Sequence, residues 1–129
     1  MFRISQILKA AQIDFTLEGD PKLADTSLMT ENVLSMCVKE AVTNIVKHSS
    51  ATACSIVIEP SSTDLIVTVK DNGIGMGGES MYSRGHGLRG IRERLEFVNG
   101  SMQIISEIGT IIRMKVPNVF RSQEKEAGI

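Results

Sequence analysis

The chain has 129 residues, of which 42% are hydrophobic and 22% charged, and its formal net charge is -1. This length suits one globular domain with a core of its own and leaves no room for a second domain. The near-neutral charge excludes the global field that draws basic proteins onto nucleic acid or anionic membranes, so any electrostatic function must be local.

Two further features bear on the compartment. No apolar stretch is long enough to span a bilayer, and the N-terminal segment lacks the apolar core and cleavage site of a signal peptide, which predicts a cytoplasmic domain. Cys37 and Cys54 lack CxxC spacing, and the two histidines are too few for a zinc-type cluster. We therefore expect both cysteines to be reduced thiols packed in the core.

The first predicted elements are a strand and a long helix. Residues 13–18, IDFTLE, alternate apolar and polar side chains, which predicts a strand with one face in water. From Thr30, which suits an N-cap, apolar pairs recur at helical spacing as far as His48. This pattern predicts one continuous amphipathic helix.

A hairpin and a second helix follow. The segments 52–59 and 64–70 are rich in β-branched residues and flank the turn-forming PSST, which predicts two antiparallel strands. The second helix ends at Asn99-Gly100, and its apolar residues recur at helical spacing at Leu88, Ile91, Leu95 and Val98.

A second hairpin, with strands at residues 101–106 and 110–117, completes the pattern. The order of elements predicts an α/β (α+β) two-layer sandwich. One β-sheet would carry both helices on one face, because the sheet is the only large surface against which they can bury their apolar sides. Residues 119–129 contain too little apolar surface to pack, and we expect a loose tail.

The segment from Asp71 to Leu95 holds seven of the eleven glycines. Residues 73–78 and 85–90 both match G-x-G-x-x-G, a weak signal in either case. The first match lacks the immediate helix of a dinucleotide site, and the chain has no Gly-Lys phosphate loop. Asn72-Gly73 could be an ordinary hairpin turn, although no alternating strand follows Gly75.

The second glycine match directly precedes the helix that contains Leu88. A helix start offers unpaired N–H groups, and Gly85 and Gly87 let an anion approach them closely, which favours a phosphate ligand. Four arginines crowd this stretch: Arg84, Arg89, Arg92 and Arg94. We expect Arg92 and Arg94 only to solvate a helix face.

Asp71 ends a predicted strand and begins the glycine-rich turn. A carboxylate accepts hydrogen bonds but does not donate them, so at the floor of a pocket it would suit the exocyclic amine of adenine and disfavour guanine. Aspartate before Asn-Gly is also common turn chemistry, and one loop can serve both purposes.

The first long helix carries a polar stripe opposite its apolar side. Glu40, Asn44 and Lys47 fall at i, i+4 and i+7, with His48 close beside them. An asparagine oxygen is a fair Mg²⁺ ligand beside phosphates, and lysine offsets their charge. The alternative is a solvated helix face, but together with the glycine segments the stripe indicates an ATP site without a phosphate loop.

These motifs resemble those of the ATP-binding catalytic domain of bacterial sensor histidine kinases, in the superfamily of gyrase, Hsp90, histidine kinase and MutL ATPases. ENVLSMCVKEAVTNIVKHS is similar to the N box of the DesK-type and NarX-like subgroup, DNGIGMG to the G1 box and RGHGLRGIRERLEFVNG to the G2 box. The final small motif is Gly109-Thr110. Four motifs in the right order, over residues 31–117, are far more specific than any one.

The resemblance implies the Bergerat-type ATP-binding fold, with a mixed sheet and a lid between G1 and G2. It implies that Asn44 binds Mg²⁺ and that Asp71 binds the adenine amine, with Thr110 joining through water. Gly73 and Gly75 would form the turn beneath the nucleotide. The remaining residues would lie over or near the phosphates: Lys47, His48, Gly85, His86, Gly87 and Leu88. The catalytic candidates are Glu40, Asn44, Lys47 and His48.

The resemblance also implies partners. Kinases of this family phosphorylate a histidine on a separate dimerisation domain, whereas His48 and His86 lie inside nucleotide motifs. We therefore expect residues 1–12 to end the linker from that domain and residues 13–118 to form the catalytic domain. The isolated domain would be monomeric and would not phosphorylate itself. A response regulator would act through the dimerisation domain, and the parent could be a membrane-bound sensor.

Three alternatives stay open at this point. An anti-sigma-factor serine kinase has the same nucleotide motifs. A gyrase-like hydrolytic ATPase uses a glutamate four residues before the asparagine, which is the spacing of Glu40. A degenerate domain would bind a partner and ignore ATP, but the intact Asn44, Asp71 and glycine motifs argue against it.

Overall fold

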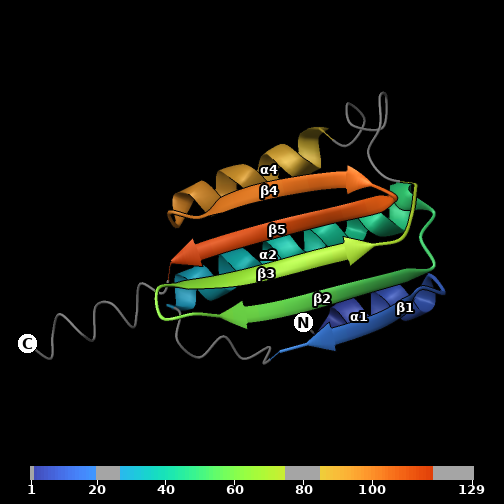
Figure 1. Cartoon of the computed structure of the whole chain (residues 1–129), viewed down its shortest axis with the longest axis horizontal. Coiled ribbons are helices and arrows are strands. Elements are labelled where there is room, and N and C mark those ends of the chain that lie inside the picture. Colours follow the sequence, from blue (N-terminus) through green and yellow to red (C-terminus); the bar gives the residue numbers. More distant parts are fainter. Residues whose placement is uncertain (1, 20–26, 75–84, 118–129) are drawn as a thin grey trace, which may run out of the picture.

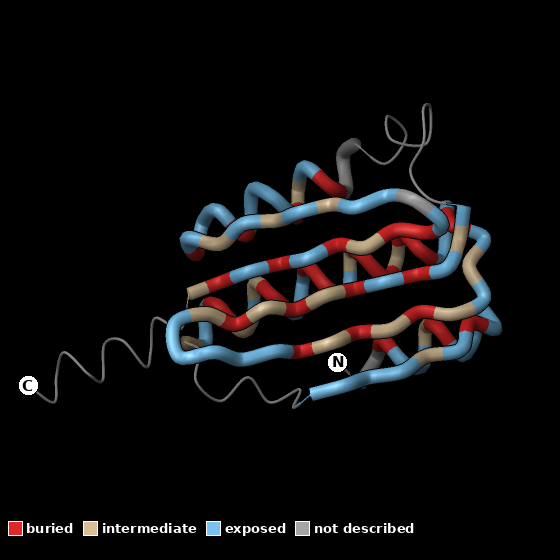
Figure 2. The backbone as a smooth tube through the Cα atoms, viewed as in Figure 1, coloured by how far each residue is buried: buried red, intermediate tan, exposed pale blue. Residues whose placement is uncertain are grey.

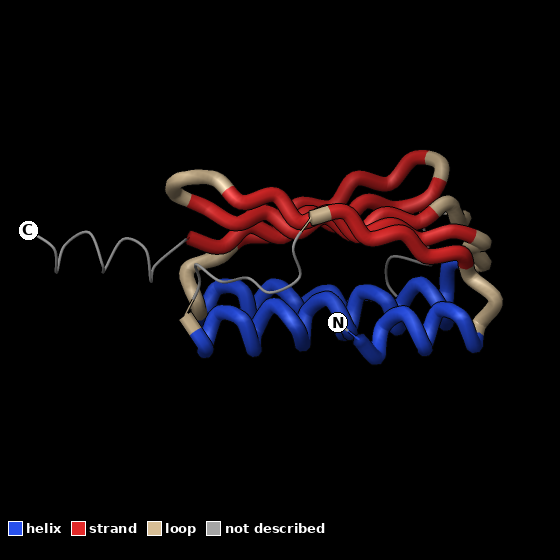
Figure 3. The backbone as a smooth tube through the Cα atoms, turned by 90° about the horizontal axis from the view of Figure 1, so that it is seen from below, coloured by secondary structure: helices blue, strands red, loops and turns tan. Residues whose placement is uncertain are grey.

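The protein, described by a computed structural model over residues 2–19, 27–74 and 85–117, has one sheet and one layer of helices (Figures 1 and 3). The elements in chain order are α1 (Phe2–Ala10), β1 (Asp14–Glu18), α2 (Leu28–Asn44), the π-helical turn η1 (Ile45–Ser49), β2 (Ala53–Pro60), β3 (Asp64–Asp71), α4 (Gly85–Phe97), β4 (Ser101–Glu107) and β5 (Gly109–Pro117).

The sheet is mixed and has the strand order β1-β2-β3-β5-β4. β1 runs parallel to β2, and the other three pairings are antiparallel. The first hairpin turns at Ser61, whose N–H donates to the carbonyl of Asp64 at 2.7 Å and whose hydroxyl accepts from the Asp64 N–H at 3.0 Å. The predicted two-layer sandwich with helices on one face of a mixed sheet is confirmed (Figure 3).

The core lies between the sheet and the helices. Alternate strand residues are buried, as the period of a strand with one wet face requires (Figure 2). Leu34 and Val38 of α2 and Ile91 and Leu95 of α4 bury their side chains against that face. Cys37 and Cys54 are buried and free, as predicted.

The start of α2 differs from the prediction. Ser27, not Thr30, caps the helix: its backbone is extended, and its side-chain oxygen accepts from the Thr30 N–H at 3.1 Å. Thr30 lies inside the first turn and is buried. Both residue types are good caps, and packing of Thr30 in the interior decides between them.

The helix predicted to run as far as His48 is confirmed, but its last turn is π-helical rather than α-helical. The α-helix ends at Asn44, and Ile45–Ser49 form a wider π turn that ends with Ser50 in the left-handed region at φ 55°. Inside this turn the Ser49 hydroxyl donates to the Ile45 carbonyl at 2.7 Å. A serine hydroxyl that satisfies a carbonyl four residues back competes with the regular helical bond, which is not visible in an apolar pattern.

The N-terminal segment contains a helix that the sequence pattern did not predict. Ile4 and Leu8 of α1 are buried in the main core. That residues 1–12 end a linker stays a prediction, and the expected tail at 119–129 lies outside the described residues. None of the described helices is long and apolar enough to cross a membrane.

Candidate functional site

Several chain ends meet at one end of the sheet. β3 ends there at Asp71, β5 begins there at Gly109, and α2 ends there at Asn44, at the right-hand end of Figure 1. α4 begins toward the same end (Figure 1). The sequence-predicted residues of the N box, the G1 box and the final small motif therefore come together, although they are far apart in the chain.

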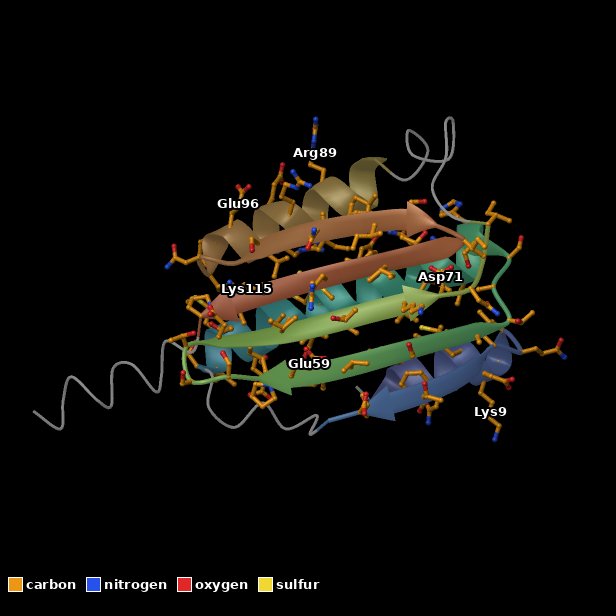
Figure 4. All side chains as sticks on the ribbon, viewed as in Figure 1. Lys9, Glu59, Asp71, Arg89, Glu96 and Lys115 are labelled. Carbon is orange, nitrogen blue, oxygen red and sulfur yellow. The ribbon has the colours of Figure 1, made fainter. Side chains whose placement is uncertain are left out.

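Asp71 lies at the last position of β3 (Figure 4) and is only 3% exposed. It belongs to the buried set of β3 that faces the helices, and its Oδ1 accepts from the Gly73 N–H at 2.8 Å. Burial raises the pKa of the neighbouring Cys54 thiol to about 12, and the negative charge of Asp71 adds to this rise. The carboxylate therefore lies in a poorly solvated environment, where a hydrogen-bond donor on a ligand would be favoured.

A shallow hollow of about 220 Å³ also touches Asp71. Its other lining residues include Thr16, Ser55 and Lys70, which alternate with the buried strand positions and so lie on the outer face of the sheet. The Asp71 carboxylate lies on the other face of the sheet, which the helices cover. This hollow is therefore not the pocket predicted above Asp71.

Two buried polar atoms at the same end of the sheet have no hydrogen-bond partner among the described residues. Thr110 pairs with Asp71 across β5 and β3 and is 2% exposed, and Asn44 is 8% exposed. Within the described part of the chain, Thr110 Oγ1 and Asn44 Nδ2 make no hydrogen bond. Unsatisfied buried polar groups are costly, and their presence here indicates a ligand or water that completes them.

Asn44 also fits a role beside a cation. Rotation of its side-chain amide exchanges nitrogen and oxygen, so the group can present a carbonyl oxygen, which Mg²⁺ prefers. Elsewhere in the described ranges, no group of three or more His, Cys, Asp or Glu side chains could hold a metal. A single protein ligand is compatible with Mg²⁺ that is held mainly by phosphates.

The polar stripe is less uniform than predicted. Asn44 is buried rather than part of a solvated face, Glu40 is half-buried, and Lys47 and His48 are exposed. The π turn separates Asn44 from the two basic residues, so they leave the helix in directions that regular i+3 and i+4 spacing does not give.

Gly73 has a packing role. A Cβ added to it would lie 2.2 Å from the Ser49 carbonyl oxygen, and the next residue, Ile74, donates its N–H to that oxygen at 2.8 Å. Only a glycine permits this approach. The alternative of a plain Asn72-Gly73 hairpin turn is wrong, since β3 pairs with β2 and β5 and the turn instead contacts the end of η1.

The second glycine segment lies inside α4. Gly85, His86 and Gly87 form the first turn of that helix, and Leu88 is buried in the core. Gly75 and lid residues 76–84 lie outside the described residues. Arg92 and Arg94 are exposed, as expected, and so is Arg89, which points away from the sheet (Figure 4).

Two residues of this region, Ser49 and Asn72, make contacts that the sequence pattern does not indicate. The Asn72 Oδ1 accepts from the N–H groups of Thr52 and Ala53, both at 2.9 Å, and its Nδ2 donates to Thr52 Oγ1 at 2.9 Å. No sequence spacing indicates these contacts, because they join segments about twenty residues apart.

Comparison with known proteins identifies the family of the chain. Residues 29–119 match the family described as histidine kinase-, DNA gyrase B-, and HSP90-like ATPase. The sensor histidine kinase DesK of Bacillus subtilis (strain 168) is 49% identical over 118 residues, which are 92% of this chain and 32% of DesK. The sensor histidine kinase YvfT of the same strain is 36% identical over 123 residues, 95% of this chain and 33% of YvfT.

The chain thus spans about a third of the length of these curated relatives. The solved structure of a blue-light activated histidine kinase from Erythrobacter litoralis has the same fold, with a TM-score of 0.76 at 21% identity over 96% of this chain and 42% of that one. The chain belongs to the family of histidine kinase-, DNA gyrase B- and HSP90-like ATPases, and within it to the DesK-like group of histidine kinase ATP-binding domains.

Proposed function

We propose that the chain binds Mg-ATP and donates the γ-phosphoryl group to a histidine on a separate dimerisation domain, as the catalytic domain of a two-component sensor histidine kinase. The observation that carries this proposal is the pair of unsatisfied buried atoms, Asn44 Nδ2 and Thr110 Oγ1, at the end of the sheet where Asp71 is buried. A polar ligand, or water held with it, would satisfy both atoms.

The base would bind at Asp71 and Thr110. The carboxylate would accept from the exocyclic amine of adenine, and the Thr110 hydroxyl would join this contact through water. Guanine carries a carbonyl oxygen at the corresponding position, which the carboxylate would repel. Gly73 would form part of the turn beneath the nucleotide.

The phosphates and Mg²⁺ would lie between the end of α2 and the start of α4. Asn44 would supply an oxygen to Mg²⁺, which neutralises phosphate charge when bound, and Lys47 and His48 would lie near the phosphates. The first turn of α4 supplies backbone N–H groups that favour anions. The backbone of Gly85, Gly87 and Leu88 would lie over the phosphates while the Leu88 side chain stays in the core, and His86 would lie near them.

Catalysis by this domain would consist mainly of positioning and charge neutralisation, as in phosphoryl transfer generally. The phosphate acceptor would be a histidine of the dimerisation domain, and a response regulator would then receive the phosphoryl group from it. We propose that the isolated domain is a cytoplasmic monomer and that its parent can be a membrane-bound sensor.

The first test is calorimetric titration of the purified chain with ATP, with and without Mg²⁺ and with GTP as the competitor. We expect Mg²⁺-dependent ATP binding that excludes GTP. Asp71→Asn presents an amide that both donates and accepts, so ATP affinity should fall at least tenfold and discrimination against GTP should narrow. No binding at millimolar ATP would refute the proposal for this chain.

The second test supplies a dimerisation domain from a similar sensor kinase together with ATP. Phosphohistidine is labile to acid and stable to alkali, so label with these properties supports the proposal. Label with the reverse stability would indicate a serine acceptor. A gyrase-like ATPase would instead hydrolyse ATP without transferring phosphate to protein, and Glu40→Ala would abolish this hydrolysis.

A further inference from the structure

Ser49 occupies a central place between the two halves of the site. It is completely buried, and its hydroxyl makes two hydrogen bonds: it donates to the Ile45 carbonyl at 2.7 Å and accepts from the Ala51 N–H at 3.1 Å. The first bond closes the π turn that begins directly after Asn44. The hydroxyl therefore determines how the chain leaves the helix that carries Asn44.

The backbone of Ser49 reaches the other half of the site. Its carbonyl accepts from the Ile74 N–H at 2.8 Å and lies against the Cα of Gly73. Gly73 in turn donates to the Asp71 carboxylate at 2.8 Å. A chain of short contacts thus runs from the π turn through Ser49 and Gly73 to Asp71.

A second connection reinforces the first. The Asn72 side chain bonds to the backbone of Thr52 and Ala53, and the Asn72 N–H donates to the Ala53 carbonyl at 3.3 Å. The segment from Ser49 to Ala53 is therefore held to the turn that follows Asp71 at both of its ends. Movement of the π turn relative to the Asp71 turn would strain these hydrogen bonds.

We infer that Ser49 is a positioning residue that couples the end of the α2 helix, with Asn44, to the turn that carries Asp71. The inference rests on the proposed nucleotide function. Ser49 would not touch ATP. Its hydroxyl would keep the amide of Asn44 and the carboxylate of Asp71 in one fixed arrangement, so that binding of the base favours binding of Mg²⁺ at the phosphates.

The alternative is that Ser49 contributes only to stability. Loss of its hydroxyl leaves the Ile45 carbonyl and the Ala51 N–H without their partner, so Ser49→Ala lowers stability in either case. A control with a comparable loss of stability, but remote from the site, separates the two roles. Val116→Ala serves for this, because Val116 is fully buried near the opposite end of β5.

The test uses three ligands at a temperature at which circular dichroism shows every variant to be folded. Adenosine reports on the base half alone, and ATP with and without Mg²⁺ reports on the metal half. We expect Ser49→Ala to weaken adenosine binding about tenfold, the effect of about one buried hydrogen bond. We also expect the factor by which Mg²⁺ tightens ATP binding to fall at least threefold, while Val116→Ala keeps both wild-type values.

The outcomes are distinct. If wild type binds ATP and Ser49→Ala keeps both quantities, Ser49 is only structural and the inference fails while the proposed function stands. If adenosine binding weakens but the Mg²⁺ factor is unchanged, or if Val116→Ala shows the same losses, the coupling is refuted. If wild type binds neither adenosine nor ATP, the proposed function fails as well.

Discussion

Three glycines allow a graded test of how the site is held together. A Cβ on Gly109 would lie 2.0 Å from the Asp71 carbonyl oxygen, and Gly109 has a φ of +85°. A Cβ on Gly73 would lie 2.2 Å from the Ser49 carbonyl oxygen, whereas a Cβ on Gly90 in α4 would meet only Arg94 Nη1 at 3.8 Å. Alanine should therefore have different effects at the three positions.

The magnitudes follow from these contacts. Gly109→Ala incurs left-handed strain of about 1–2 kcal/mol and also forces β5 away from Asp71, which adds about 1–3 kcal/mol of overpacking. Gly73→Ala has no such dihedral strain and should cost about 1–3 kcal/mol. Gly90→Ala removes backbone freedom from the unfolded chain and should stabilise the protein by about 0.5–1 kcal/mol.

Urea unfolding followed by far-UV circular dichroism measures all three variants against wild type. The expected order of stability is Gly90→Ala, wild type, Gly73→Ala and then Gly109→Ala. Because Gly73 and Gly109 both contact the Asp71 region, their folded variants should also bind ATP more weakly, and Gly90→Ala supplies the matched control for stability. Wild-type stability of Gly109→Ala, or a clear loss in Gly90→Ala, would refute the packing argument.

Further predictions concern the cap of α2 and the two buried cysteines. Ser27→Ala removes the cap of α2 and should lower the free energy of unfolding by about 1 kcal/mol. ATP affinity should not change, because Ser27 and Asn44 lie at opposite ends of α2. A lower ATP affinity would contradict this prediction. Burial raises the pKa of the Cys37 thiol to about 11 and that of Cys54 to about 12, so a thiol reagent at pH 8 should label them only after unfolding. Both folded-state pKa values lie above the ordinary 9.0 of a thiol, so ionisation of these thiols favours the unfolded chain. Their contribution to the free energy of unfolding is fully present below pH 9.0 and is lost as pH rises through 11 and 12. Above pH 9.0 the free energy of unfolding of Cys54→Ala should therefore fall less steeply with pH than that of wild type. Urea titrations at several pH values measure this, and an equal fall in both proteins would contradict the raised pKa of Cys54.

The type and order of most elements, and the nucleotide motifs, can be predicted from the sequence alone. Side-chain periodicity is local, so the alternation in β2 and β3 and the helical spacing in α4 can be read from a few residues at a time. The polarity of Asp71 and Asn44, and the glycines near them, indicated phosphate and base recognition for the same local reason.

How these residues are held depends on contacts that exist only in the folded chain. The short helix α1 depends on burial of Ile4 and Leu8, because a helix of nine residues is not stable alone. The π turn, the burial of Asn44 and the pairing of Thr110 with Asp71 arise from contacts between distant segments. Such contacts depend on how whole elements pack, so they cannot be predicted from residue types or from spacings in the chain.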